Sequence, residues 1–414
     1  MFHDRVRPSS PTVADALADE LARQRDTLAM IASENHVSEA VLAAQGSVLT
    51  NKYAEGTPGD RYYGGCEHAD RVESLAIEHA RELFDADHVN VQPHSGSQAN
   101  AAAMLAVLEP GDTVLSAGLR DAGHLSHGHA GNLSGRIFEV ERYGLDPETG
   151  RVDYEGLRET AERIEPDMIV SGFSAYPREV DWERIQAVAA ETDAVHLADI
   201  AHVSGLVAAG VHASPVGVAD IVTGSTHKTI RAGRGGIVMC DETHAEAVDR
   251  AVMPGVQGGP AMHNVAGKAV GFEEALEPEF ASYAEQTVAN ARALADGLEA
   301  RGFDLATGGT DTHLVLADLR ETHDLRGNEA ERALEEVGIV LNANAVPGDP
   351  RPPKDPSGVR AGTPALTTRG FDEAAVAEVA DCIARVLESP DDAAVRSDVA
   401  ATVADLCERF PLYE

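Results

Sequence analysis

The chain has 414 residues, long enough to bury a large core and to form a large domain together with a smaller one. Its 33 lysine and arginine residues stand against 69 aspartate and glutamate residues, which gives a formal net charge of −36. An acidic surface without a basic stripe argues against nucleic acid as a partner. Heavy acid with only four lysines is typical of a protein adapted to a salty cytoplasm, where counter-ions screen self-repulsion.

The positions of the cysteines and the hydropathy of the chain argue against further classes of protein. Cys66, Cys240, Cys382 and Cys407 lie far apart with no C-x-x-C pair, which argues against a disulfide framework and a thiolate metal site. No uninterrupted apolar run reaches membrane-spanning length, and the first residues lack an apolar core behind a basic stretch. We therefore expect a cytoplasmic protein without membrane contact.

Apolar spacing predicts alternating helices and strands over the first two thirds of the chain. Helices are predicted at residues 13–31, 38–48, 68–84, 153–164, 183–191 and 241–252, and strands at residues 88–92, 113–116, 136–140, 168–171, 194–198 and 219–222. This alternation favours an α/β fold with a mostly parallel sheet covered on both faces. In such sheets, ligands bind at the carboxyl ends of the strands.

The last third of the chain has a different pattern. Helices are predicted at residues 278–301 and 371–387, and strands at residues 313–319 and 339–341. We expect an N-terminal arm and helix (1–30), a large domain (31–272) and a smaller α+β C-terminal domain (273–414).

A turn suited to phosphate follows the strand at 88–92. Ser95-Gly-Ser97 leads into an alanine-rich helix, whose first turn offers free N–H groups beside two hydroxyls. Ordinary N-capping by serine is the alternative.

Lys228 follows an apolar strand among hydroxyl-bearing residues and glycines. The other lysines are Lys52, Lys268 and Lys354. A desolvated lysine, unlike arginine, loses its proton and attacks carbonyls, so Lys228 is a candidate Schiff-base residue. A surface lysine that ends a strand is the alternative.

Asp199 lies at a predicted strand end, with His202 three residues later. A carboxylate about 4 Å from a pyridinium nitrogen stabilises the cation by roughly 4 kcal/mol, enough to keep an electron-accepting ring charged. Capping of the next helix is the alternative. Arg360, between Gly358 and Gly362, suits a substrate carboxylate, and an ion pair between domains is its alternative.

Three weaker patterns remain. His124-Leu-Ser-His-Gly-His129 invites a metal interpretation, but no thiolate or carboxylate pair completes the ligand set. The alternatives are histidines that stack or form hydrogen bonds in a pocket. The loop at residues 50–65 carries Tyr53, Glu55 and Tyr63 among glycines and prolines, which is typical either of a site or of a packed surface loop. The glycine loops 233–236 and 254–260 are either turns or backbone donors for an anion.

Taken together, these stretches closely resemble the serine hydroxymethyltransferase family, which consists of fold-type I pyridoxal-phosphate enzymes. The likeness runs almost from end to end, through IASEN (31–35), TNKYAEG (50–56), RYYGGCE (61–67), VQPHSGSQAN (91–100), SGFSAY (171–176), DIAH (199–202), THKT (226–229), RGG (234–236), QGGP (257–260) and SGVRAGTPA (357–365). The resemblance implies a reversible interconversion of serine and glycine, with transfer of a one-carbon unit to tetrahydrofolate or a related pterin. It also implies a homodimer or a dimer of dimers.

The resemblance also implies residue roles. Lys228 carries pyridoxal 5'-phosphate as an aldimine, Asp199 pairs with the ring nitrogen, His124 stacks on the ring, and Arg360 binds the amino-acid carboxylate with Ser33. Further cofactor contacts are Ser95, Gly96, Ser97, Ser174, His202, Ser225 and His227, with Gly258 and Gly259 reaching the phosphate from a neighbouring subunit. Glu55 transfers protons, and Tyr53 and Tyr63 line the site, with Tyr53 and Glu55 coming from the partner chain.

The folate-contacting surface of the family corresponds to Glu55, Leu119, Gly123, Leu125 and Asn344. This chain departs from the family pattern there, with Arg120-Asp-Ala122 before the stacking histidine and Lys354 before Arg360.

Three other functions compete with this interpretation. A folate-independent aldolase of the threonine type would use the same lysine and ring pocket. A metal-dependent hydrolase would use the histidines of residues 124–129, and a non-catalytic phosphate binder would use only the serine turn. Neither of the last two explains Lys228, Asp199 and Arg360 together.

The charge balance leads to a first prediction. The thermal unfolding midpoint should rise by at least several degrees when about 1 M KCl is added, because the Debye length falls from about 10 Å at 0.1 M to about 3 Å. Scanning calorimetry across a KCl series tests this, with sucrose as an uncharged control. A midpoint that stays flat in KCl would contradict the halophilic interpretation.

Overall fold

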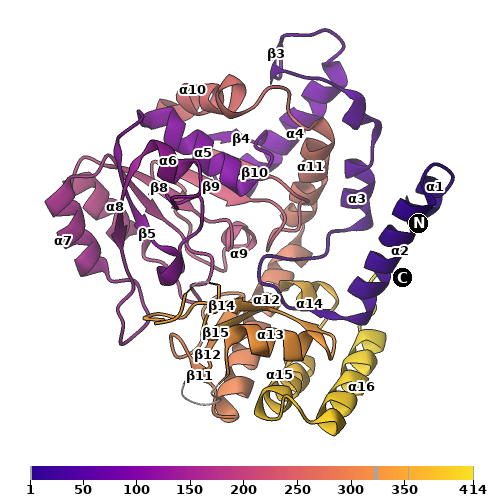
Figure 1. Ribbon diagram of the computed structural model, residues 1–414. Coiled ribbons are helices and arrows are strands. Elements are labelled where there is room, and N and C mark those ends of the chain that lie inside the picture. Colours follow the sequence, from indigo (N-terminus) through magenta and orange to yellow (C-terminus); the bar gives the residue numbers. More distant parts are fainter. Residues whose placement is uncertain (1, 321–324, 353, 414) are drawn as a thin grey trace.

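The computed structural model of the protein describes residues 2–320, 325–352 and 354–413, so the predicted outer domain limits at residues 1 and 414 lie outside it. Two main sheets organise the chain (Figure 1). The seven-stranded sheet has the order β4-β10-β9-β8-β7-β5-β6, and the four-stranded sheet has the order β11-β12-β15-β14. Two two-stranded ladders, β1-β13 and β2-β3, accompany them. The large sheet is mostly parallel, as the sequence predicts, with β10 antiparallel to both neighbours.

The large sheet and its helices occupy the first two thirds of the chain. Its strands are β4 (His88–Asn90), β5 (Thr113–Ala117), β6 (Glu139–Tyr143), β7 (Met168–Ser171), β8 (Val195–Asp199), β9 (Ile221–Ser225) and β10 (Gly236–Cys240). Its helices are α3 (Glu39–Gln45), α4 (Glu67–Phe84), α5 (Gly96–Val107), α6 (Ser134–Ile137), α7 (Tyr154–Ile164), α8 (Trp182–Glu191), α9 (Ser204–Ala208), α10 (Glu242–Arg250) and α11 (Met262–Leu276). The hairpin β2 (Gly56–Thr57) and β3 (Asp60–Arg61) stands beside α4.

The remaining elements form the second sheet and its surroundings. They are α1 (Phe2–Val6), α2 (Pro11–Asp26), β1 (Leu28–Ala29), α12 (Pro278–Ala300), β11 (Asp304–Leu305), β12 (Leu314–Asp318), α13 (Gly327–Glu335), β13 (Ile339–Val340), β14 (Asn342–Asn344), β15 (Gly358–Gly362), α14 (Pro364–Thr368), α15 (Glu373–Glu388) and α16 (Ala393–Arg409).

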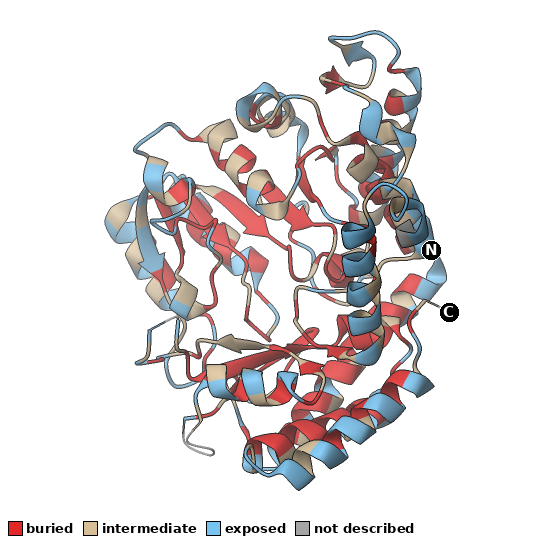
Figure 2. Cartoon of the chain, turned by 45° about the vertical axis from the view of Figure 1, so that its right-hand side comes forward, coloured by how far each residue is buried: buried red, intermediate tan, exposed pale blue. Residues whose placement is uncertain are grey.

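Both faces of the large sheet are buried (Figure 2). Leu115, Ile169 and Val222 point into one apolar cluster, whereas their neighbours Val114 and Ile221 point into a second cluster on the other face, which includes α5 and α10. Successive residues of a strand face opposite sides, so a strand buried on both sides needs a continuous apolar run. This is why these strands were visible in the sequence.

A third apolar cluster marks the smaller part of the molecule. It gathers residues from Leu294 onward, together with Leu28 and Met30 near the N-terminus. The large cluster, by contrast, extends to Val288, so the packing changes over within α12. Leu28 and Ala29 belong to this smaller part because β1 pairs in parallel with β13.

Several predicted elements differ from the structure. The helix expected to reach residue 31 ends at Asp26, because the chain then extends into β1. The strand expected at 136–140 begins at Glu139, after the short helix α6. The strand β9 continues through the polar residues to Ser225, where a buried hydrogen-bonded ladder with β10 accommodates them. The strand β15, which carries Arg360, and the helix α16 were not predicted from the sequence.

Among the described residues, no helix is sufficiently long and apolar to traverse a lipid bilayer.

Arg369 ties the two ends of the chain to the smaller part. Its buried guanidinium donates to the main-chain carbonyls of Thr27 (2.9 Å), Arg25 (3.0 Å), Cys407 (3.2 Å) and Phe410 (2.7 Å). The side chain of Arg25 in turn donates to the carbonyls near the C-terminus.

Replacement of Arg369 by methionine should lower the free energy of unfolding by about 2–4 kcal/mol, because it leaves buried carbonyls without donors. Urea titration at constant salt measures the change. The matched control is Arg385→Met, which removes a half-exposed ion pair with Asp398 (2.6 Å) and should cost less than about 1 kcal/mol. Equal losses in the two variants would contradict this role for Arg369.

Candidate active site

A cavity of about 320 Å³ lies at the carboxyl ends of the central strands of the large sheet. It contains most of the residues that the sequence predicts for cofactor and amino-acid binding. Those residues are Ser33, Ser95, Gly96, Ser97, His124, Ser174, Asp199, His202, Ser225, His227, Lys228 and Arg360. Residues not predicted from the sequence also line it, namely Asn100, His127, Phe173, Ala201 and Arg234.

The serine turn begins α5 as predicted. Ser95 is its N-cap, and its Oγ accepts a hydrogen bond from the Gln98 N–H at 3.2 Å. A Cβ at Gly96 would lie 2.6 Å from the Ser225 Oγ, so a side chain there would require the serine hydroxyl to move. The close approach of β9 to the first turn of α5 therefore presents backbone N–H groups and hydroxyls to one end of the cavity. Capping and anion binding are compatible here, since Ser95 caps one N–H only.

Asp199 ends β8 and is buried at the base of the cavity. Its Oδ2 accepts from His127 Nε2 and from Asn100 Nδ2, both at 2.8 Å, and its Oδ1 accepts from the Ala201 N–H. Burial alone would raise the pKa of this carboxyl. The hydrogen bond and charge of His127, with smaller contributions from His124 and Asn100, hold the pKa well below its usual range. Asp199 therefore stays ionised, as a partner of a pyridinium requires.

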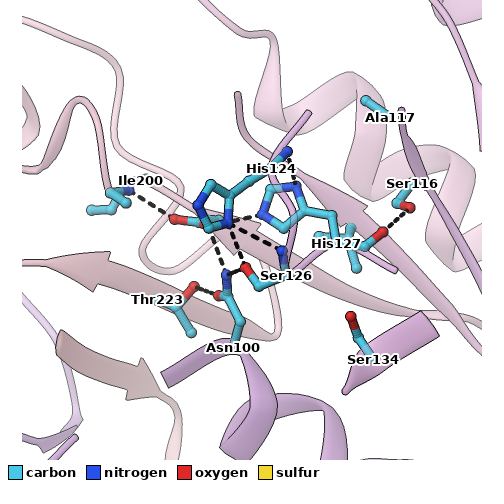
Figure 3. Close-up of polar contacts among 12 residues, drawn as sticks. Asn100, Ser116, Ala117, His124, Ser126, His127, Ser134, Ile200 and Thr223 are labelled. Atoms are coloured by element: carbon cyan, nitrogen blue, oxygen red, sulfur yellow. Dashed lines mark hydrogen bonds and ion pairs between the residues drawn. The ribbon is translucent and has the colours of Figure 1, made fainter. Parts of the chain in front are cut away.

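His124 is oriented by the same network (Figure 3). Its Nδ1 lies 2.7 Å from Ser126 Oγ, and Asn100 donates to that oxygen at 2.8 Å. Asn100 is itself fixed, because its Oδ1 accepts from Thr223 Oγ1 at 2.5 Å. Burial lowers the pKa of His124 to about 4, so the ring is neutral near pH 7 and can stack on another neutral or cationic ring.

The supporting residues Asn100 and Ser126 were not predicted from the sequence, and neither was the particular role of His127. The spacing His124-Leu-Ser-His127 indicated either a metal motif or stacking and hydrogen-bonding histidines in a pocket, and the structure has the hydrogen-bonded arrangement. In the structure His127 is hydrogen-bonded to Asp199, and His129 is exposed. The described residues contain no group of three or more histidine, cysteine, aspartate or glutamate side chains arranged to hold a metal ion.

Lys228 lies three residues beyond β9 and is buried. Burial is the main reason that its pKa falls to about 8, with Arg360 and Arg234 lowering it further and Asp199 opposing them. The main-chain carbonyl of Lys228 accepts from Asn35 Nδ2 at 2.9 Å, which fixes the backbone that carries the amine. Because Lys228 is buried, the alternative of a surface lysine does not hold. Within the described residues it forms no ion pair with a carboxylate.

His202 lies between the cavity and a second buried histidine. Its Nδ1 is 3.3 Å from His313 Nε2, and the rings stack with centroids 5.5 Å apart. Burial, followed by the charges of Lys228 and Arg360, keeps the pKa of His202 far below its ordinary value. His202 is therefore a neutral hydrogen-bonding group at this position.

Arg360 enters the cavity from the smaller sheet. Its hydrogen bonds go to neutral oxygens, Asn342 Oδ1 at 3.1 Å and the Ser174 carbonyl at 2.5 Å. No carboxylate among the described residues pairs with it, and burial lowers its pKa only to about 10, so it remains cationic. The domain-interface ion pair is thus absent from the described part of the chain. A buried guanidinium without an acid is suited to an incoming carboxylate.

Five of the predicted site residues gather elsewhere. Tyr53 and Tyr63 pack edge to face with centroids 5.8 Å apart, and Tyr53 Oη donates to Glu55 Oε1 at 3.3 Å. A Cβ at Gly258 would lie 2.9 Å from that same oxygen, and one at Gly259 would lie 3.2 Å from the Tyr53 ring. None of these residues lines the cavity of their own chain. We call this group the tyrosine–glycine cluster.

The residues predicted to contact folate also lie outside the cavity lining. Leu119 is in a short 3-10 turn (Leu119–Asp121), Leu125 is exposed, and Asn344 is in β14. Gly123 is buried against the main chain of Ala117, where a Cβ would lie 2.2 Å from its carbonyl oxygen. Their contact with a pterin remains a prediction.

The cavity fits a phosphorylated pyridine aldehyde on the chemistry of its donors. The serine turn offers donors to phosphate, Asp199 is an ionised acceptor, and Lys228 is an amine poised to lose its proton. His227 Nδ1 is also buried without a hydrogen-bond partner among the described residues. The fold and the site therefore define a fold-type I pyridoxal-phosphate enzyme.

Comparison with known proteins narrows this class. The family model described as serine hydroxymethyltransferase matches residues 6–383. Proteins named serine hydroxymethyltransferase from Halobacterium salinarum, Natronomonas pharaonis and Haloarcula marismortui are 67%, 66% and 66% identical, over 100% of this chain and 100%, 98% and 100% of theirs. The chain belongs to the serine hydroxymethyltransferase family. Its activity is the pyridoxal-phosphate-dependent interconversion of serine and glycine with tetrahydrofolate as co-substrate. The folate-independent aldolase interpretation is therefore set aside.

The lowered pKa of Lys228 makes a measurable prediction for the cofactor-free chain. Acetylation of Lys228 by a short pulse of acetic anhydride should reach half its maximum near pH 8, rather than near 10.5, because only the unprotonated amine reacts. Asp199→Asn should move that midpoint lower still, since the Asp199 charge favours the protonated amine. Peptide mass spectrometry across pH gives the profile, and Lys228→Arg identifies the signal. A midpoint near 10.5 would show that Lys228 is solvated.

Proposed function

We propose a role in the family's reaction for each of the charged and polar residues of the cavity. The observation that carries the proposal is the meeting of three buried charged groups in one cavity: Lys228, Arg360 and Asp199. Lys228 and Arg360 form no ion pair with a carboxylate in the described residues, and Asp199 is held ionised by His127 and Asn100. When bound, pyridoxal phosphate supplies an aldehyde that condenses with amines and a cationic ring that withdraws electrons from the substrate's α-carbon.

Cofactor binding uses groups from both ends of the cavity. Ser95, Gly96 and Ser97 hold the phosphate through backbone N–H groups and hydroxyls. The Asp199 carboxylate keeps a proton on the ring nitrogen, and His127 and Asn100 keep that carboxylate ionised and in place. The neutral ring of His124 stacks on the cofactor. Ser174 and His202 lie at its phenolic oxygen, and Ser225 and His227 flank the lysine.

Substrate binding uses the guanidinium of Arg360 with Ser33. Arg360 pairs with the amino-acid carboxylate, which places the α-carbon near Lys228. The lysine amine gives up its position to the substrate amine and recovers it at product release. Because its pKa is near 8, the amine exchanges protons readily at neutral pH.

We propose that Glu55 moves the proton on the hydroxymethyl and carrier side of the reaction, in the cavity of a second copy of the chain. Support comes from the tyrosine–glycine cluster, because none of its residues lines the cavity of its own chain. Tyr53 and Tyr63 are also at least half exposed, so their side chains are accessible to a second chain. Hydrogen bonding to Glu55 raises the pKa of Tyr63, so this tyrosine belongs with the same group. Gly258 and Gly259 touch Glu55 and Tyr53, so we expect all five to reach the partner's cofactor together. The assembly is then a homodimer or a dimer of dimers.

We also propose that residues 31–272 form the cofactor-binding domain and residues 273–414 the smaller domain that supplies Arg360, while residues 1–30 form an arm. Tetrahydrofolate or a related pterin binds beside Leu119, Gly123, Leu125 and Asn344. A cytoplasmic location is supported by the four cysteines, which are all buried and unpaired.

Complementation between two inactive variants tests the shared site. Lys228→Ala alone should lose turnover by about 10³-fold or more, and Glu55→Gln alone should bind cofactor but lose folate-dependent transfer. Co-expressed, random pairing should restore about a quarter of the wild-type activity, because half of the dimers carry one complete site. The assay is tetrahydrofolate-dependent conversion of serine to glycine.

The matched control mixes Lys228→Ala with Lys228→Gln, which offers no complete site and should recover nothing. Activity that stays at the sum of the separate variants would show that Lys228 and Glu55 act within one chain. Full activity in Glu55→Gln alone would remove Glu55 from the reaction.

A further inference from the structure

Lys268 is among the largest fully buried side chains in the described residues, and the reaction as derived above does not use it. It lies on α11, on a chain with three other lysines, and it has no ion pair with a carboxylate in the described part of the molecule. Glu73, the acid whose charge acts on Lys268, is already bound by Arg61 (2.5 Å) and Gln92 (2.7 Å). A buried cation with no counter-ion is costly, so it needs a compensating role.

The ammonium of Lys268 is bound entirely by the main chain. Its Nζ donates to the carbonyls of Val91 (2.6 Å), Pro93 (2.9 Å) and Gly236 (2.9 Å). Three acceptors require all three N–H bonds of the protonated form. Burial lowers the pKa of Lys268 to about 7, and the charge of Glu73 opposes that shift. The three carbonyls accept hydrogen bonds from the protonated amine and therefore also favour its charged form.

Two of these carbonyls belong to the segment that leads into the serine turn, and the third belongs to the strand beside it. Val91 and Pro93 link β4 to Ser95, and Gly236 begins β10. The Gly236 N–H donates to the Pro93 carbonyl at 3.0 Å, which closes the connection between the segments. A Cβ at Gly236 would lie 2.3 Å from the Ser95 carbonyl oxygen, and one at Gly235 would lie 2.1 Å from Lys268 Cε. Because residues 235 and 236 are both glycine, the Lys268 ammonium can approach their backbone from one side and the serine turn from the other.

We propose that Lys268 is a positioning residue for the phosphate site, which fixes the 91–97 backbone and supplies a positive charge behind it. This rests on the proposed phosphate role of Ser95–Ser97. Charge-assisted hydrogen bonds polarise the bonded peptide groups, so the lysine strengthens the donors that face a phosphate. Arginine cannot replace it, because a planar guanidinium does not converge on three carbonyls around one nitrogen.

The test compares two ligands that differ only in the phosphate. Dissociation constants for pyridoxal phosphate and for pyridoxal are measured on the cofactor-free full chain by fluorescence quenching. The constant for pyridoxal divided by the constant for pyridoxal phosphate reports the phosphate's own contribution and cancels any inactive fraction of the sample. We expect Lys268→Met to lower this ratio at least tenfold with pyridoxal affinity changed by less than about threefold, and Lys268→Arg not to restore it.

Arg369→Met is the matched control, since Arg369 is also a buried cation bound by main-chain carbonyls but lies in the smaller part of the molecule. It should lower stability and leave the ratio unchanged. If Lys268→Met does not fold, Gly235→Ala takes its place, because the added methyl displaces the ammonium while keeping its charge. This variant should also lower the ratio.

The outcomes separate the two proposals. A wild-type chain that binds both ligands equally would overturn the phosphate role of the serine turn itself. A wild type that prefers the phosphorylated ligand, with the preference retained in Lys268→Met or in Gly235→Ala, would overturn the role of Lys268 and leave the turn's role intact.

Discussion

The site depends on the removal of positive charges from water in a protein whose surface is strongly negative. Lys228 and Arg360 share one cavity, and Lys268 binds the backbone at Val91 and Pro93, which leads to the serine turn at one end of it. None of the three forms an ion pair with a carboxylate in the described residues. Desolvation of an amine lowers its pKa, which makes Lys228 a nucleophile near neutral pH. Asp199 opposes this effect, and its own ionisation depends on His127 and Asn100. Reactivity therefore follows from burial of the cavity as a whole.

The fold explains why charges from distant segments meet there. Parallel strands end at one edge of the sheet, so β8 and the segment after β9 bring Asp199 and Lys228 together. The smaller sheet contributes Arg360 from β15, and the Ser174 carbonyl that it contacts comes from the large part. The guanidinium thus joins the two sheets, and its proposed role is to bind the substrate carboxylate.

The sequence was informative where a local pattern determines the structure. Continuous apolar runs located the strands β7 and β8 nearly to the residue, and the serine turn was visible because the N-cap and helix are adjacent in sequence. The grouping of the catalytic residues came from a family resemblance that spans the chain. Strands such as β10 and β15 were not predicted, because glycine-rich segments are typical of loops. In the structure their glycines allow close approach of the neighbouring backbone.

The rest of the site depends on contacts between residues far apart in the sequence. Asn100 and Asp199 are 99 positions apart, and nothing local marks the asparagine as a partner. Lys268 was noticeable as one of four lysines, yet only the packing of α11 against the strand ends shows its three acceptors. The position of the tyrosine–glycine cluster outside its own cavity likewise cannot be read from its motifs.

The scarcity of lysine has a practical consequence. With Lys228 and Lys268 sequestered in the interior, side-chain amines at the surface are limited to Lys52 and Lys354. Lys354 is exposed beside the strand that carries Arg360, while Lys52 is half-buried next to Tyr53 and donates to the Gly64 carbonyl. Attachment of the enzyme to an amine-reactive support would therefore tether it through very few side chains, in a nearly uniform orientation.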